Sequence, residues 1–254
     1  MHEWKGQQAA ASWDASGGGP LPTRAEQQAI LLALLAASET GDGAMLDLGI
    51  GSGLVAEAVL DAQPSWQLVG VDFSDAMLEL ARERLSRFGS RVLLVAGDLS
   101  EPRGIALPSL SFRAAFSVQT IHHLSDIDKA AVFAWLAALI EPGGLIVIID
   151  RVRVEEPLFR DWAAVWRKLD PRTPETYAEH AEELRRAGDQ PALLQDQLAW
   201  MEEAGLVTSC LHLYGNRAVI VGRKPEGEST AVPRPLQGRA GRGASSTRSS
   251  TSFW

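Results

Sequence analysis

The chain has 254 residues, of which 46% are hydrophobic and 22% charged, and its formal net charge is −8 at pH 7. This composition is ordinary for a globular protein, and the acidic balance argues against a nucleic-acid partner, which needs clustered Lys and Arg. A single cysteine, Cys210, excludes an internal disulfide and a cysteine-based zinc site. We see no signal peptide and no apolar run long enough to span a bilayer, so we expect a cytoplasmic protein without a membrane partner.

Strands and helices are predicted to alternate along most of the chain. Residues 1–22 contain Gly, Ser and Trp and predict an irregular N-terminal arm. Thr23 and Glu26 have the spacing of a capping box, which predicts a helix that begins there. Beyond it, the pattern predicts strands at 44–48, 66–71, 91–97, 114–118 and 145–150, and helices at 53–61, from Ser74, and around 127–139. Strands that are apolar throughout indicate a parallel sheet covered on both faces.

The pattern changes in the C-terminal part. Residues 151–205 have helical periodicity without a convincing strand, and we interpret them as a helical lid over the substrate. Trp162 and Trp166 lie four residues apart on one helical face, where their rings could wall an apolar pocket. Residues 206–223 predict a hairpin that adds an antiparallel edge to the sheet. Residues 226–254 are rich in Arg, Ser and Gly and predict a disordered tail.

A glycine-rich loop follows the first predicted strand, in the stretch MLDLGIGSGLVAEAVL at 45–60. Gly49, Gly51 and Gly53 occupy alternate positions between that strand and the next helix. Because glycine lets a ligand approach the backbone closely, this spacing indicates a ligand held against the loop. Asp47 lies just inside the strand end, where it could also cap the helix.

Acidic residues end the next two predicted strands. Asp72 follows the second strand, where a carboxylate can accept the hydroxyls of a ribose. Asp98 follows the third strand, and the backbone N–H of Leu99 beside it suits the edge of an adenine. Since the carboxyl ends of parallel strands meet at one edge, these residues and the glycine loop should form one crevice.

Together these stretches resemble the class I S-adenosylmethionine-dependent methyltransferases. The motifs that carry the resemblance are LDLGIGSG, VGVDFSDAMLELARERL, AGDLSE, AFSVQTIHHLSD and LIEPGGLIVIID, within positions 40–150. The resemblance implies an α/β, Rossmann-like fold with a seven-stranded, mostly parallel sheet of order 3-2-1-4-5-7-6, strand 7 antiparallel, and helices on both faces. It places the methyltransferase domain at 23–225 and implies S-adenosylmethionine as the cofactor.

The same resemblance implies which residues bind the cofactor. Asp47, Gly49, Gly51 and Ser117 would lie around its methionine part, Gly53 would also bind the cofactor, and Asp72 would bind the ribose. Phe73 and Met77 would flank the adenine, and Asp98 and Leu99 would hold its edge.

Two adjacent histidines, His122 and His123, follow the fourth predicted strand. No second His or Cys cluster completes a metal site, so we expect no metal. A neutral imidazole can deprotonate a hydroxyl near pH 7, and we expect His123, or else His122 or His180, to be that base. An acceptor that is already ionised would need no base.

The expected partner is a small-molecule methyl acceptor. The stretch SVQTIHH lacks the Asn- or Asp-Pro-Pro-aromatic motif of nucleic-acid amino-methylating enzymes. O-methylation is favoured, and N- or C-methylation stays open. A nicotinamide-dependent reductase is disfavoured because Leu54 replaces the third glycine and no Tyr-x-x-x-Lys occurs. The remaining alternative is a cofactor-binding, catalytically inactive partner or regulatory protein.

Overall fold

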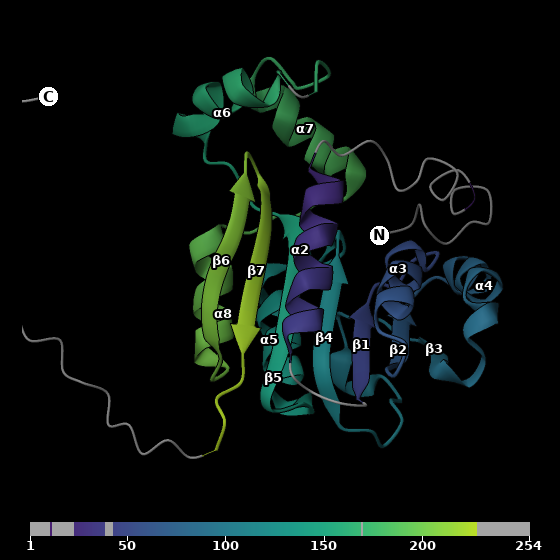
Figure 1. Cartoon of the computed structure of the whole chain (residues 1–254). Coiled ribbons are helices and arrows are strands. Elements are labelled where there is room, and N and C mark those ends of the chain that lie inside the picture. Colours follow the sequence, from purple (N-terminus) through teal and green to yellow (C-terminus); the bar gives the residue numbers. More distant parts are fainter. Residues whose placement is uncertain (1–10, 12–22, 39–42, 169, 228–254) are drawn as a thin grey trace, which may run out of the picture.

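The computed structural model describes residues 11, 23–38, 43–168 and 170–227. Its strands form one seven-stranded sheet of order β3-β2-β1-β4-β5-β7-β6, in which the first five pair in parallel and β7 is antiparallel to β5 and β6 (Figure 1). The predicted fold is therefore confirmed. Apart from residue 11 and residues 226–227, the predicted arm and the predicted tail lie outside the described residues.

The elements follow one another with the predicted alternation. The strands are β1 Ala44–Leu48, β2 Gln67–Asp72, β3 Val92–Ala96, β4 Phe112–Val118, β5 Ile140–Arg151, β6 Val207–Tyr214 and β7 Arg217–Arg223. The α-helices are α2 Arg24–Ala37, α3 Leu54–Ala62, α4 Asp75–Arg84, α5 Asp126–Leu139, α6 Phe159–Trp166, α7 Tyr177–Ala187 and α8 Leu194–Glu203. None of the described helices is both long and apolar enough to span a bilayer.

Helices cover both faces of the sheet because successive side chains of a strand point to opposite faces. Met45 packs with α2, α3 and α4 on one face, whereas Leu46 packs with α5 and α8 on the other (Figure 1). β1 is buried along its whole length. This double cover explains why its sequence is continuously apolar except at Asp47.

The helices α2 and α4 begin next to the predicted residues Thr23 and Ser74, but only Ser74 forms a side-chain capping bond. Ser74 caps α4, and its hydroxyl accepts a hydrogen bond from the Met77 N–H at 3.3 Å. Thr23 precedes α2 as predicted, but its hydroxyl makes no capping bond, and the Oγ1 atom is buried without a hydrogen-bond partner among the residues that the structure describes. The predicted capping box with Glu26 is therefore wrong, because the backbone at Thr23 does not take the extended conformation that a cap requires.

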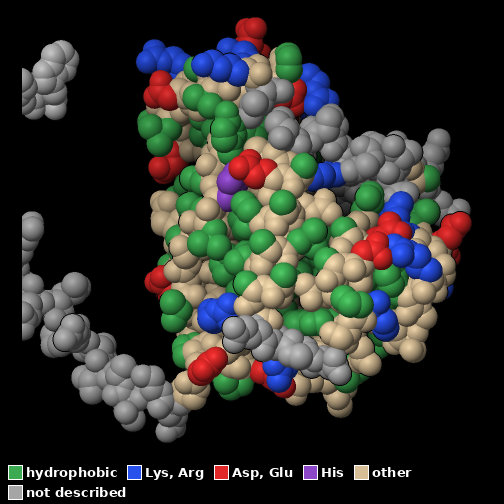
Figure 2. Space-filling view, viewed as in Figure 1, with side chains coloured by type: hydrophobic (Ala, Val, Ile, Leu, Met, Phe, Trp, Pro, Cys, Tyr) green, Lys and Arg blue, Asp and Glu red, His purple; other side chains and the backbone are tan. Residues whose placement is uncertain are grey.

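In its described part, the predicted insertion forms three α-helices that lie in two different places. α6 and α7 lie beyond the carboxyl ends of the parallel strands, where Lys and Arg side chains gather at the top of the molecule (Figures 1 and 2). α8 instead packs against α5 and β6 and belongs to the layer that covers the sheet. The two ends of the segment between β5 and α8 are joined by one backbone hydrogen bond, from the Arg153 N–H to the Ala192 carbonyl at 2.8 Å.

An aromatic cluster connects this segment to the β6–β7 hairpin. The rings of Trp162 and Trp166 are stacked with centroids 6.0 Å apart, and a Cβ on Gly215 in the hairpin turn would lie 2.3 Å from the Trp166 ring. The cluster also contains Phe159, Tyr177, His180 and Tyr214. Trp162, Trp166 and His180 do not line the cavity described below. The two tryptophans thus stabilise the insertion instead of walling the cavity.

Candidate active site

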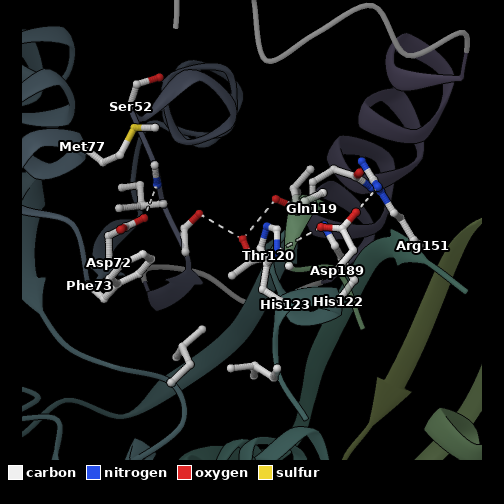
Figure 3. Close-up of a pocket in the computed structure, with 18 of the residues that line it drawn as sticks. Ser52, Asp72, Phe73, Met77, Gln119, Thr120, His122, His123, Arg151 and Asp189 are labelled. Carbon is white, nitrogen blue, oxygen red and sulfur yellow. Dashed lines mark hydrogen bonds and ion pairs between the residues drawn. The ribbon is translucent and has the colours of Figure 1, made fainter. Parts of the chain in front are cut away.

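A cavity of about 580 Å³ opens at the carboxyl edge of the sheet, between the glycine loop and the insertion. Figure 3 shows its two ends: Asp72, Phe73 and Met77 at one, and the two histidines with Asp189 and Arg151 at the other. Seven of the ten predicted cofactor residues line it, namely Gly49, Gly51, Asp72, Phe73, Met77, Asp98 and Leu99. The cavity therefore brings together residues from the ends of five strands and from the insertion.

The three other predicted cofactor residues lie outside the cavity wall. Asp47 is buried beneath the loop, and Gly53 is the left-handed residue before α3. The Ser117 hydroxyl is fully buried and donates to the Leu48 carbonyl at 2.8 Å, which ties β4 to β1. Val118, Gln119 and Thr120 line the cavity in its place.

The glycines of the loop serve different purposes. Gly49 has φ +69°, and a Cβ there would lie 2.3 Å from the Thr120 side chain, so the protein itself requires this glycine. Gly51 has φ +55°, and a Cβ there would find no other atom closer than 4.0 Å. The open space beside Gly51 faces the cavity, so this backbone is the part of the loop that a ligand can approach closely.

Asp72 connects the loop to the second strand end. Its carboxylate accepts the Gly51 N–H and the Ser74 N–H, both at 2.9 Å. Burial raises the pKa of Asp72, and the backbone N–H groups of Ser74, Gly51 and Phe73 partly oppose this shift. A carboxylate has about four lone-pair sites, so the three backbone N–H groups leave capacity for a ribose hydroxyl.

Asp98 and Asp47 differ in burial. Asp98 is exposed, and its Oδ1 accepts both the N–H and the hydroxyl of Ser100, at 2.9 and 2.8 Å. This turn directs the buried Leu99 into the cavity wall. Asp47 is only 3% exposed, and burial followed by the charge of Asp72 raises its pKa well above the usual value. A cation bound in the cavity would therefore favour the ionised form of Asp47.

His122 is held by the end of β5. Its Nδ1 lies 2.5 Å from Asp150 Oδ1, and its backbone N–H donates to Asp150 Oδ2 at 2.8 Å. Burial lowers the pKa of His122, although the Asp150 carboxylate opposes the shift. Burial would raise the pKa of Asp150, but His122 and the N–H of Arg151 bring it below the usual value. Near pH 7 the carboxylate is therefore ionised and the imidazole neutral, with Nδ1–H as the donor.

His123 is the more accessible ring, with 25% of its side chain exposed. Its Nδ1 lies 3.2 Å from Asp189 Oδ1, and His122 Nε2 lies 3.5 Å from the same oxygen. Arg151 Nη1 pairs with Asp189 Oδ2. Burial would raise the pKa of Asp189, but the two histidines and Arg151 lower it. An ionised Asp189 can accept Nδ1–H from His123, which leaves His123 Nε2 as the basic nitrogen.

The insertion delivers Asp189 through a fixed loop. Gly188 ends α7 in the left-handed conformation, and the following backbone N–H of Gln190 donates to the His122 carbonyl at 2.6 Å. The buried ammonium of Lys129 donates to the carbonyls of Leu124 and Gln190, at 2.7 and 2.5 Å, and to the Asp126 carboxylate at 2.9 Å. All three ammonium protons are thus used to hold the loop against the histidine turn.

Sequence reasoning missed several cavity residues. Asp189 belongs to the insertion and follows a helix-ending glycine, so no motif marks it. Gln119 has φ +56°, the only positive φ of a non-glycine residue among the described residues. Its N–H donates to the Ile149 carbonyl at 2.8 Å, and its Oε1 accepts Arg217 Nη1 at 3.0 Å. A strained residue held in place at a strand end is a feature of functional sites.

His122, His123 and Asp189 could also offer ligand atoms to a metal, since these atoms lie within 4.8 Å of one another. Each atom already has a neighbour in the protein, because Asp189 is paired with Arg151 and contacts both histidines. An additional cation would have to compete with the Arg151 guanidinium for this carboxylate. The absence of a metal stays a prediction.

Comparisons with known proteins follow the same region of the chain. A family model described as "Methyltransferase domain" matches residues 45–144. Trans-aconitate 2-methyltransferase of Acidovorax sp. (strain JS42) is 32% identical over 128 residues, which are 48% of this chain and 46% of that protein. The chain spans less than half the length of the first curated relatives that it matches.

Two solved structures have a similar fold. An O-methyltransferase family protein from Burkholderia thailandensis has a TM-score of 0.63 at 17% identity, over 89% of this chain and 62% of that one. Haemonchus contortus phosphoethanolamine N-methyltransferase 2, solved with S-adenosyl-L-methionine, has a TM-score of 0.65 at 15% identity, over 87% and 58%. The prediction of a methyltransferase domain is confirmed over residues 45–144, and the two solved structures share the fold of this chain. S-adenosylmethionine, the cofactor expected with such a domain, is the one bound in the second structure.

Proposed function

We propose that this chain transfers a methyl group from S-adenosylmethionine to a hydroxyl of a small molecule. The carrying observation is that one cavity is lined both by Asp72 and the glycine loop and by a histidine paired with a carboxylate. The names of the relatives, a trans-aconitate methyltransferase and an O-methyltransferase family protein, support a small acceptor and methylation on oxygen.

The cofactor suits the first end of the cavity. The open backbone at Gly51 and the unused lone pair of Asp72 fit a nucleoside, and Phe73, Met77 and Leu99 offer apolar surface to its base. When bound, S-adenosylmethionine supplies a methyl group already activated on a sulfonium. The raised pKa values of Asp47 and Asp72 indicate that a positive charge would be favourable beside them.

The second end of the cavity provides the base. Asp189 orients His123, so that Nε2 accepts the proton of the acceptor hydroxyl as its oxygen bonds to the methyl carbon and the sulfur–carbon bond breaks. The products are the methylated acceptor, S-adenosylhomocysteine and a proton on His123. We assign His122 a positioning role, because Asp150 holds one of its nitrogens and Asp189 lies beside the other.

The domain assignment belongs to the same proposal. Residues 23–225 act as the methyltransferase domain, the insertion as a lid over the acceptor, and residues 226–254 as a dispensable tail. α8 is part of the covering layer, so the lid is restricted to the segment before it.

The test is methyl transfer from tritium-labelled cofactor into the small-molecule fraction of a cell extract. His123→Ala should lower kcat by about 100-fold or more while the affinity for S-adenosylhomocysteine holds. His212→Ala is the matched control, because His212 lies on β6 and outside the cavity. Cofactor binding without any transfer would instead support a non-enzymatic partner or regulatory protein. Normal turnover by His123→Ala would remove this residue from the mechanism.

A further inference from the structure

Three buried nitrogen donors belong to neighbouring residues, two of which line the acceptor end of the cavity. Gln119 Nε2, Arg151 Nε and Arg217 Nε have no hydrogen-bond partner in the part of the chain that the structure describes. Arg217 is bonded to the Gln119 amide oxygen, and Arg151 pairs with Arg217 across β5 and β7. Buried polar groups are almost always paired, so unpaired donors of three neighbours indicate a missing acceptor.

The surrounding charges favour an anion as that acceptor. Burial and then the charge of Arg151 lower the pKa of Arg217 to about 9, and Arg24 contributes further repulsion. Arg217 therefore still carries its charge at pH 7 beside that of Arg151. The facing acids, Asp150 and Asp189, are already bonded to His122 and Arg151. A further anion beside the arginines would reduce their mutual repulsion.

Gln119 and Arg151 line the cavity, whereas Arg217 is not among its lining residues. Among the described residues, the Oδ1 of Asn216, which is next to Arg217 in the chain, also has no hydrogen-bond partner, so we leave Arg217 Nε out of the proposed anchor. The positive φ of Gln119 is independent evidence that this amide is held at a functional site at a cost in backbone energy. The amide oxygen of Gln119 accepts a hydrogen bond from Arg217, and its NH2 group has no acceptor among the described residues.

We propose that the methyl acceptor carries an anionic oxygen group, a carboxylate or a phosphate monoester, which accepts hydrogen bonds from Gln119 Nε2 and Arg151 Nε. This anchor holds the acceptor while the hydroxyl to be methylated lies beside His123. The inference rests on the proposed methyl transfer in this cavity. It adds that a neutral molecule of the same shape is a poor acceptor, because its groups would bring no negative charge to the donors of Gln119 and Arg151.

The experiment uses calorimetry on the full chain, with and without saturating S-adenosylhomocysteine. The probes are citrate for carboxylates, phosphoethanolamine for phosphate monoesters, and trimethyl citrate as the neutral counterpart. Gln119→Glu keeps the oxygen that Arg217 bonds but replaces the free NH2 with a negative charge. Gln195→Glu, an exposed position on α8, is the matched control for the change in charge.

We expect one anionic probe to bind and the neutral ester not to bind. Gln119→Glu should weaken the anion at least tenfold, and Gln195→Glu should leave it unchanged. Arg151→Lys, which keeps a charge beside Asp189 but removes the Nε donor, should also weaken it. Binding of citrate alone assigns a carboxylate, and binding of phosphoethanolamine alone assigns a phosphate.

Three results would overturn the inference: no binding of either anion, binding of the neutral ester as tight as that of the anion, or anion binding that both cavity variants leave unchanged. The affinity for S-adenosylhomocysteine is measured separately in each variant. If the unmodified chain does not bind S-adenosylhomocysteine, the proposed methyl transfer is contradicted. If it binds S-adenosylhomocysteine but neither anion, only the anchor is contradicted.

Discussion

Replacing Asp72 by Asn separates cofactor binding from folding. The substitution keeps one acceptor oxygen for a backbone N–H and removes the charge that we assign to a ribose hydroxyl. Hydrogen bonds to a charged group contribute about 1.5–3 kcal/mol, so the affinity for S-adenosylhomocysteine should fall by about 10- to 150-fold. Asp72 is 7% exposed, and burial raises its pKa, which means that its charge already costs stability. The melting temperature should therefore change by only a few degrees.

Isothermal titration calorimetry with S-adenosylhomocysteine measures the affinity, and calorimetric melting without ligand measures stability. Asp75→Asn is the matched control, since it is the same substitution at an exposed position on α4, three residues further along the chain. An affinity equal to that of the unmodified protein, in a folded Asp72→Asn variant, would refute the assignment of the ribose to this carboxylate. A lower melting temperature with unchanged affinity would assign Asp72 to the loop alone.

The other predictions concern charge and metal. Because the pKa values of Asp47 and Asp72 are raised in the folded protein, the contribution of these two carboxyls to the stability of the cofactor-free protein should fall as the pH rises from near 4 through these values. Over the same window, affinity for cationic S-adenosylmethionine should rise, which calorimetry across pH can follow. Asp47→Asn should raise the melting temperature without ligand and weaken the cofactor; a lower melting temperature would contradict this. EDTA should leave methyl transfer unchanged, because Arg151 already binds Asp189; loss of activity restored by a divalent ion would reverse that prediction.

The sheet and the cofactor end could be predicted because their causes are local in the sequence. An apolar strand, a glycine loop and a strand-ending acid can each be recognised from residues that are adjacent in the sequence. Parallel pairing of the strands then brings Gly51 and Asp72 together. Ser117 shows the limit of this reasoning, since a side chain at a strand end can point between strands instead of into the cavity. The alternation of a strand does not indicate which of its last residues faces a ligand.

The acceptor end depends on contacts between residues distant in the sequence. Asp189 reaches His123 across 66 positions because α7 ends at Gly188 and Lys129 holds the following loop. Arg217 reaches Gln119 only because β7 inserts between β5 and β6. Nothing in the spacing of these residues announces their proximity, so composition and periodicity could indicate a lid but not what it contributes.

The hydrogen bond between Arg153 and Ala192 makes the lid a closed excursion from the sheet. Both ends of the excursion are fixed at one point, so an exchange of the intervening chain for a shorter or longer one would leave the strand register intact. Such a change in loop length costs little, because closure entropy grows only with the logarithm of length. Asp189 and Gln190 lie inside the excursion, however. A grafted lid would therefore have to supply a carboxylate in place of Asp189. One exchange of the lid would then change both the acceptor preference and the carboxylate that orients His123.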